Sequence, residues 1–128
     1  MERPTRLTAS RIIGLDLSKK TLVGCTLSEK DGFQRKRFFS GQMNAAGRSK
    51  LASTLGSTDA VFMEGGSSSF TLARYLLNHT ESQVFVLNPM QLHIIFESMC
   101  KTDKQDAAKI AKYARDAHPE NWVLIPIP

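Results

Sequence analysis

Four acidic residues occupy positions where a carboxylate is either unusual or well placed for chemistry. Asp16 interrupts an apolar strand pattern, Glu64 ends another just before two glycines, and Asp103 and Asp106 stand three residues apart in a helical pattern. Gathered carboxylates repel one another unless a divalent cation neutralises them, and all-oxygen ligation selects Mg²⁺ or Mn²⁺. The four acids therefore predict a metal centre suited to phosphodiester chemistry.

Simpler structural roles compete with this interpretation. Asp16 could cap the turn at Ser18, and an acid such as Asp103 in a first helical turn is favoured by the helix dipole alone. Asp106 has no such explanation, because helical geometry puts it on the apolar stripe that contains Ile110. Asp106 is thus the most informative of the four.

Other titratable residues are excluded from the predicted site. Asp59, Glu97 and Asp116 fall at predicted turns or on polar arcs of helices. The three histidines are scattered and none has a second ligand at helical spacing, so they support neither metal binding nor acid–base chemistry.

Alternating and periodic apolar residues predict the elements that must position the acids. Strands are predicted first as hairpins and then in alternation with helices, which indicates an α/β fold with a mixed β-sheet flanked by α-helices. The basic third strand suits a sheet edge. The predicted strands are 11–17, 21–27, 33–39, 60–63 and 84–87, the predicted helices are 44–55, 68–78 and 103–117, and 88–97 is a short connection.

Three of these boundaries depend on capping residues. Asn44 is a candidate cap for its helix, and Ser67 or Ser68 for the next. Thr102 and Gln105 match a capping box, which would make Asp103 the first residue of the last helix.

Charge points to an anionic partner. The 17 basic residues exceed the 12 acidic ones by five, and by about nine once the four candidate ligands are set aside. A phosphate-tracking surface for nucleic acid near the carboxylates is one interpretation, and a merely solvated basic face is the other. The candidate nucleic-acid-binding residues are Lys19, Lys20, Arg35, Lys36, Arg37, Lys101 and Lys104.

Length and composition indicate one compact domain. Cys25 and Cys100 lack the spacing of a zinc site or a disulfide framework and are predicted to be reduced core thiols. Neither a membrane span nor a signal peptide is apparent, so a cytoplasmic protein is expected. The predicted organisation is a flexible segment 1–10, a domain 11–118 and a tail 119–128.

Four short motifs together resemble the DEDD transposases, the insertion-sequence recombinases that work with a structured bridge RNA. The motifs are the run from Ile13 to Lys19, Met63-Glu64-Gly65, Leu87-Asn88-Pro89 and the run from Lys101 to Ala107. The resemblance implies an RNase H-like fold of the RuvC type. It also implies that Asp16, Glu64, Asp103 and Asp106 form the metal-binding catalytic quartet.

The same resemblance implies partners and a larger protein. DNA, a structured non-coding RNA and further copies of the chain are the expected partners. Family members continue into a second domain with a serine nucleophile, so residues 119–128 are expected to begin a linker to it, and the chain alone is expected to be incomplete and inactive.

Two other functions stay open on the sequence. Gly14-Leu15-Asp16-Leu17-Ser18 is also similar to the phosphate-binding hairpin of actin-like and sugar-kinase ATPases, although Leu17 and Lys19 stand where Gly and Thr are expected. A non-catalytic basic module that binds RNA or DNA is the second alternative, and it would bind with a strong salt dependence but without metal.

Overall fold

A computed structural model describes residues 8–99 and 105–128 of the chain. Strands come first and then alternate with helices, as the sequence predicts. The elements are β1 (Arg11–Leu17), β2 (Thr21–Ser28), the 3₁₀ turn η1 (Glu29–Asp31), β3 (Arg37–Gln42), α1 (Ala45–Ser53), β4 (Asp59–Glu64), α2 (Ser67–His79), β5 (Gln83–Leu87), α3 (Pro89–Met99), α4 (Asp106–Asp116), the 3₁₀ turn η2 (Pro119–Asn121) and β6 (Leu124–Ile125).

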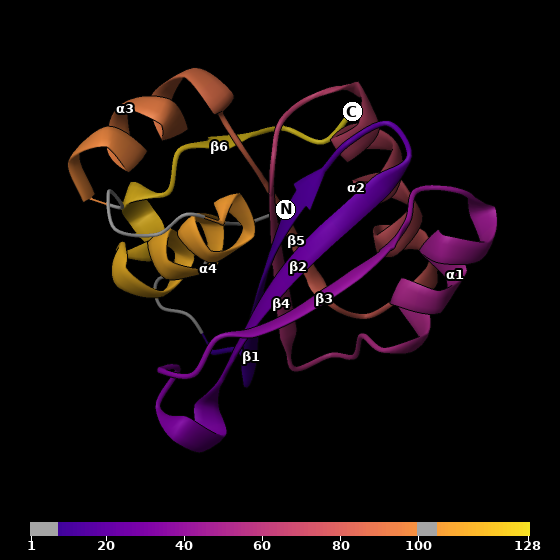
Figure 1. The fold of residues 1–128 in the computed structure, drawn as a ribbon, viewed down its shortest axis with the longest axis horizontal. Coiled ribbons are helices and arrows are strands. Elements are labelled where there is room, and N and C mark those ends of the chain that lie inside the picture. The colour runs from indigo at the N-terminus through magenta and orange to yellow at the C-terminus, as the bar shows by residue number, and fades with distance from the viewer. Residues whose placement is uncertain (1–7, 100–104) are drawn as a thin grey trace.

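The described strands form one mixed sheet of six, in the order β3-β2-β1-β4-β5-β6. β1, β2 and β3 form an antiparallel meander, β1, β4 and β5 are parallel, and β6 is antiparallel to β5. Helices α1 and α2 cover one face, and α4 covers the other, with α3 beside it (Figure 1). The carboxyl ends of β1, β4 and β5 therefore meet at one edge of the sheet.

Alternation along the central strands divides the core between the two faces. Ile12 and Phe62 belong to the cluster beneath α4, whereas Ile13, Leu15 and Met63 belong to the cluster beneath α1 and α2. This period-two pattern is the one that the sequence predicts for residues 11–17. Burial on both faces explains why β1 and β4 are apolar almost throughout.

Gly14 lets α4 lie directly on β1. A Cβ at this position would collide with backbone atoms of Ala107 and Ala111, which cannot move away as a flexible side chain could. The close approach of helix and strand depends on the missing side chain. It brings the start of α4 to the end of β1 that carries Asp16.

Two predicted elements are shifted along the chain. The third strand, predicted at 33–39, spans Arg37–Gln42, because Gly32 and Phe33 both adopt left-handed backbone conformations after η1 and delay pairing until Arg37 meets Thr26. Its place at the edge of the sheet is as predicted. In the second helix the N-cap is Gly66, which gives no side-chain cap, so capping by Ser67 or Ser68 is wrong.

The segment predicted as a short connection over 88–97 is the helix α3. Asn88 and Pro89 start it: the Asn88 Oδ1 accepts hydrogen bonds from the amides of Met90 at 3.0 Å and Gln91 at 3.2 Å. Proline is well suited to the first helical position, where no amide hydrogen is needed. The helix was missed because its apolar residues lack a clear period.

The last helix begins at Asp106, not at Asp103. Gln105 is its N-cap and has an extended backbone, so the predicted capping box is wrong for Gln105, while Thr102 and Asp103 lie outside the described residues. The helical phase assumed for Asp103 therefore does not apply. Ile110 is buried as predicted.

Residues 119–128 contribute to the fold. Trp122 is buried and packs edge-on against Phe62, with 4.9 Å between ring centroids, and β6 adds the last strand beside β5. The prolines around this strand had concealed it. The domain boundaries and the start of a linker stay predictions.

Cys25 is buried in the core, and Cys100 lies outside the described residues. Within those residues no helix is both long and apolar enough to cross a membrane.

Candidate metal centre

Asp16 and Glu64 lie at the carboxyl ends of adjacent parallel strands. The register pairs Leu15 of β1 with Met63 of β4, so the acid that comes next in each strand lies at the same edge of the sheet. Asp16 is exposed, and the side chain of Glu64 is 36% exposed. This is the edge where α/β proteins place ligands, because the strands end there and leave a crevice.

Asp106 reaches the same edge from α4. The helix crosses β1 at Gly14, so its first residue projects beyond the apolar contact and its side chain is 55% exposed. The sequence had put Asp106 on the core-facing stripe. The structure places it at the end of that stripe, in solvent, beside the strand-end acids.

Burial and neighbouring acids both raise the pKa of the two strand-end acids. Loss of hydration raises the pKa of Asp16, and the charge of Asp106 raises it further. Loss of hydration also raises the pKa of Glu64; His93 opposes this effect, while Asp106 and Asp16 add to it. Acidic neighbours that add to a raised carboxyl pKa are typical of carboxylates sharing a site.

The side chains of Asp16, Glu64 and Asp106 do not surround a single point closely enough to form a complete set of metal ligands. Among the described residues, no group of three or more His, Cys, Asp and Glu side chains is arranged to hold one metal ion. Asp103, the fourth predicted ligand, lies outside those residues.

Two basic residues that the sequence analysis did not include accompany the acids. His93 Nε2 lies 3.6 Å from Glu64 Oε1, and Lys109 Nζ lies 3.6 Å from Asp106 Oδ1. The ammonium of Lys109 also lies over the ring of Phe96, 5.7 Å from its centroid, which links α4 to α3. A helix start recognised at Asn88 would have put His93 near β4, and so near Glu64.

A shallow pocket of about 320 Å³ opens beside two of the acids. Its lining combines Asp16 and Glu64 with Lys19, Gly65, Gly66 and the serines that begin α2. Ser69 is buried, and its hydroxyl donates to the Gly66 carbonyl at 2.7 Å. The pocket is polar and joins the β1–β2 turn to the start of α2.

The predicted basic residues separate into two groups. Lys19 and Lys20 form the exposed turn that follows Asp16. Arg37 pairs with Thr26, which pairs with Ile13, so the segment containing Arg35 and Lys36 lies toward the other end of the sheet. Lys101 and Lys104 are outside the described residues.

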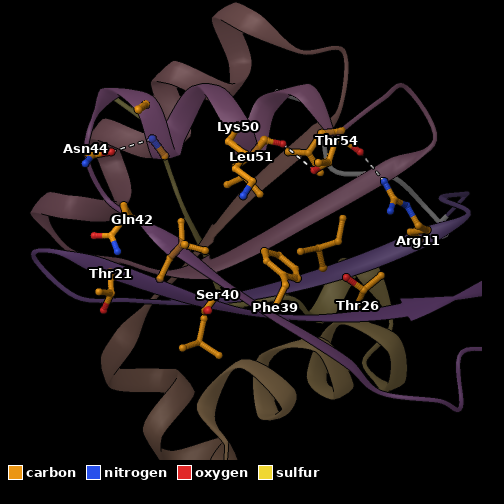
Figure 2. Close-up of a pocket in the computed structure, with 17 residues that line it drawn as sticks. Arg11, Thr21, Thr26, Phe39, Ser40, Gln42, Asn44, Lys50, Leu51 and Thr54 are labelled. Atoms are coloured by element: carbon orange, nitrogen blue, oxygen red, sulfur yellow. Dashed lines mark hydrogen bonds between the residues drawn. The ribbon is translucent and has the colours of Figure 1, made fainter.

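A larger pocket lies away from the acids. It has a volume of about 970 Å³ between α1 and the β2–β3 part of the sheet, with Phe39 and Leu51 inside and Arg11 at one end (Figure 2). An Arg11 guanidinium nitrogen donates to the Thr54 carbonyl at 2.8 Å and helps close that end. None of the predicted site residues lines this pocket.

Comparison with known proteins identifies relatives of this architecture. The family model of IS110-type DEDD transposases, described as "Transposase", matches residues 13–123. No curated protein matches the sequence. The fowlpox virus resolvase, solved with Holliday junction DNA, is similar in fold, with a TM-score of 0.51, 11% identity, and coverage of 82% of this chain and 97% of the resolvase. A second structure of the fowlpox virus Holliday junction resolvase has a TM-score of 0.49 at 11% identity and covers 84% of this chain and 99% of that one.

Proposed function

The chain belongs to the IS110-type DEDD transposase family, and we propose that Asp16, Glu64, Asp103 and Asp106 form its metal-dependent site for cleaving and exchanging DNA strands. The predicted RNase H-like fold of the RuvC type is confirmed by the likeness to the resolvase. That resolvase was solved with Holliday junction DNA, and we infer a DNA substrate for this chain by analogy.

One observation carries the proposal: Asp16 and Glu64 stand at the carboxyl ends of adjacent parallel strands, and Asp106 comes to the same edge from α4. Burial raises the pKa of Asp16 and of Glu64, and the charge of Asp106 raises both further. Such an arrangement is unfavourable for the bare protein, since each charge opposes the next. A divalent cation would remove the repulsion, and hard carboxylate oxygens suit Mg²⁺ or Mn²⁺.

The acids and Lys19 have different proposed roles. Asp16, Glu64, Asp103 and Asp106 would hold the metal, which when bound supplies charge stabilisation and an activated oxygen nucleophile for phosphodiester cleavage. Asp16 and Glu64 are attached to rigid strands, so their carboxylates are held in place for this task. Lys19, on the rim of the pocket, would hold a phosphate of the substrate.

The wider assignment follows from the family. We infer that residues 11–118 act as one domain of a transposase, with DNA, a structured RNA and further copies of the chain as partners. Strand exchange would need a second domain with the serine nucleophile. Family membership argues against the ATPase alternative, and the metal-independent binding module remains the competing outcome for the following test.

Calorimetric titration with Mn²⁺ tests the site. E64Q and D16N should each bind Mn²⁺ at least tenfold more weakly than the unmodified chain, because each lacks a ligand carboxylate. E81Q is the matched control, since Glu81 is exposed and lies outside the site. Unchanged Mn²⁺ affinity in both E64Q and D16N would overturn the proposal. D103N extends the test to the fourth acid.

A further inference from the structure

The face of the sheet beneath α4 is only partly covered. Helix α4 packs on β1 and β2 and leaves the edge strand β3 open. Phe38 of β3 is 51% exposed, one of the few large apolar side chains of the described residues that face solvent, and Ser40 is exposed as well. A solvent-facing aromatic ring on an edge strand needs an explanation other than core packing.

The strand register connects this open strip with the acids. Asp16 pairs with Val23, and Val23 pairs with Ser40, so the three residues form one row across the sheet. Phe38 stands two residues from Ser40 and therefore on the same face. Strand spacing and rise put Phe38 about 12 Å from Asp16 on this face. Val23, between them, is half-buried against the cluster beneath α4, so the open part of the face is the β3 edge.

Phe38 contrasts with its neighbour Phe39. The Phe39 ring covers Gly24 on the opposite face, so closely that a Cβ on the glycine would collide with it. Phe39 is partly buried and packs against the cluster beneath α1 and α2. It has a structural role, whereas Phe38 contributes its ring to the surface.

Basic residues lead into the strand that carries the exposed ring. Arg35 is exposed in the segment before β3, and Arg37 is exposed on the edge strand, on the face of Phe39 and opposite to Phe38. Arg115 of α4 donates to the carbonyl of Phe33 at 3.0 Å, which fixes the segment that leads into β3. Positive charge on an edge strand discourages pairing with another strand and favours a polyanion.

We propose that this strip binds a single-stranded segment of nucleic acid, with Phe38 as a stacking platform for a base and Arg35, in the segment that leads into β3, on its phosphates. Every base has a face that can stack, and a basic surface holds the backbone without reading sequence. The binding surface stands on its own, and only its role of leading a strand to the acids rests on the proposed function.

Fluorescence anisotropy with a labelled oligothymidylate and the metal-free 128-residue chain provides the first test. F38A should weaken binding about tenfold, and F38L nearly as much, because leucine keeps apolar contact but loses stacking. R35Q should weaken binding and reduce its salt dependence. M90A is the control, because Met90 is a more exposed apolar residue on α3.

F38W adds an optical signal for stacking. The only tryptophan, Trp122, is buried, so the indole introduced at position 38 should be the one that oligothymidylate quenches. Equal affinity of F38A and the unmodified chain would overturn the proposal. If F38L binds oligothymidylate as strongly as the unmodified chain does, the proposal is also overturned, because binding would then need only an apolar side chain and not an aromatic ring that stacks on a base.

D16N and E64Q separate this proposal from the previous one. Neither variant should weaken binding of oligothymidylate to the metal-free chain, since each removes a negative charge that repels phosphate, whereas both should lose Mn²⁺ affinity. If F38A binds normally and D16N still loses Mn²⁺, only the nucleic-acid strip is wrong. If D16N keeps Mn²⁺ affinity and F38A weakens binding, only the metal site is wrong.

Discussion

The two ends of the β1–β4 strand pair differ in how their charges are arranged: the amino end holds an ion pair, and the carboxyl end holds like charges. At the amino end, Arg11 of β1 meets Asp59 of β4 in two contacts of 2.7 Å, and the Asp59 side chain is only 3% exposed. At the carboxyl end of the same strands, Asp16 and Glu64 are both acidic, and burial together with the charges of Asp106 and Asp16 raises the pKa of Glu64.

This difference separates an acid that supports the fold from acids available for chemistry. Asp59 is buried with its charge matched, and it also accepts a hydrogen bond from the Gly56 amide at 2.8 Å. The hydrogen bond to Asp59 and its charge raise the pKa of Arg11, although burial opposes this effect. Within residues 8–99 and 105–128, the strand-end acids lack an equivalent partner, since His93 lies 3.6 Å from Glu64 and is itself exposed. An arrangement that is unfavourable for folding is retained where a ligand can resolve it.

The largest effect is expected when the carboxyl end is disturbed through its packing. G14A should lower the free energy of unfolding by about 3 kcal/mol, because the new methyl group forces α4 away from β1. It should also weaken Mn²⁺ binding by moving Asp106. Urea denaturation and calorimetry measure the two effects, and G56A is the control because a Cβ there meets nothing within 4 Å. Similar losses in G14A and G56A would contradict this explanation.

At the amino end, D59A should lower the free energy of unfolding by about 2 kcal/mol. The loss is smaller than for a fully buried pair because the Arg11 side chain is 39% exposed and water can solvate it. Mn²⁺ affinity should not change. Thermal and urea denaturation measure the stability, and D116A, which removes an exposed acid paired with its neighbour Arg115, is a suitable comparison. A D59A chain as stable as the unmodified one would show that the pair is not structural.

At the carboxyl end, E64Q should stabilise the chain instead of destabilising it. We expect it to raise the free energy of unfolding by up to about 1 kcal/mol at neutral pH without metal, a small gain because the partly exposed Glu64 is screened by solvent. Burial and acidic neighbours raise the folded-state pKa of Glu64 above its ordinary 4.5, so the folded chain binds this proton more tightly than the unfolded chain. That stabilisation is present below pH 4.5 and is lost as the pH rises through the raised pKa.

Urea denaturation of chelator-treated samples across this pH range tests whether E64Q raises or lowers the free energy of unfolding. The advantage of E64Q over the unmodified chain should grow from acid to neutral pH, and E81Q should show no such trend. A gap between E64Q and the unmodified chain that shrinks as the pH rises would contradict the like-charge description of this end.

The smallest effect is expected for Lys109, the counter-charge of Asp106. K109M should change the free energy of unfolding by only a few tenths of a kcal/mol, because a pair one helical turn apart with an exposed acid contributes little. The methionine keeps the apolar contact with Phe96. Denaturation curves at low and high salt measure this change in the free energy of unfolding. A decrease of more than about 1 kcal/mol would mean that Lys109 stabilises the packing of α3 on α4 more strongly than an exposed ion pair can.

The sequence by itself determined the elements with strong period-two alternation and the identity of the acids at their ends. β1 was predicted with the bounds that the structure has, and Asp16 was singled out because a carboxylate does not fit an apolar strand. Glu64 followed from the same reasoning at the end of β4. The positions of these strands and of the two acids in them follow from alternation and burial, which are local properties of a strand, whereas the role of the acids as metal ligands stays a prediction.

Tertiary structure decided what depends on contacts between distant segments. Sequence periodicity could not show that α4 starts at Asp106 or that α3 is a helix, since the first depends on a backbone change at Gln105 and the second on a cap at Asn88. Helix phase aligned Asp106 with the core, yet its position beyond the Gly14 contact leaves it in solvent beside Glu64. Only the packing of α4 across β1 brings Asp106 within electrostatic reach of the strand-end acids, because no local pattern encodes the distance between two elements.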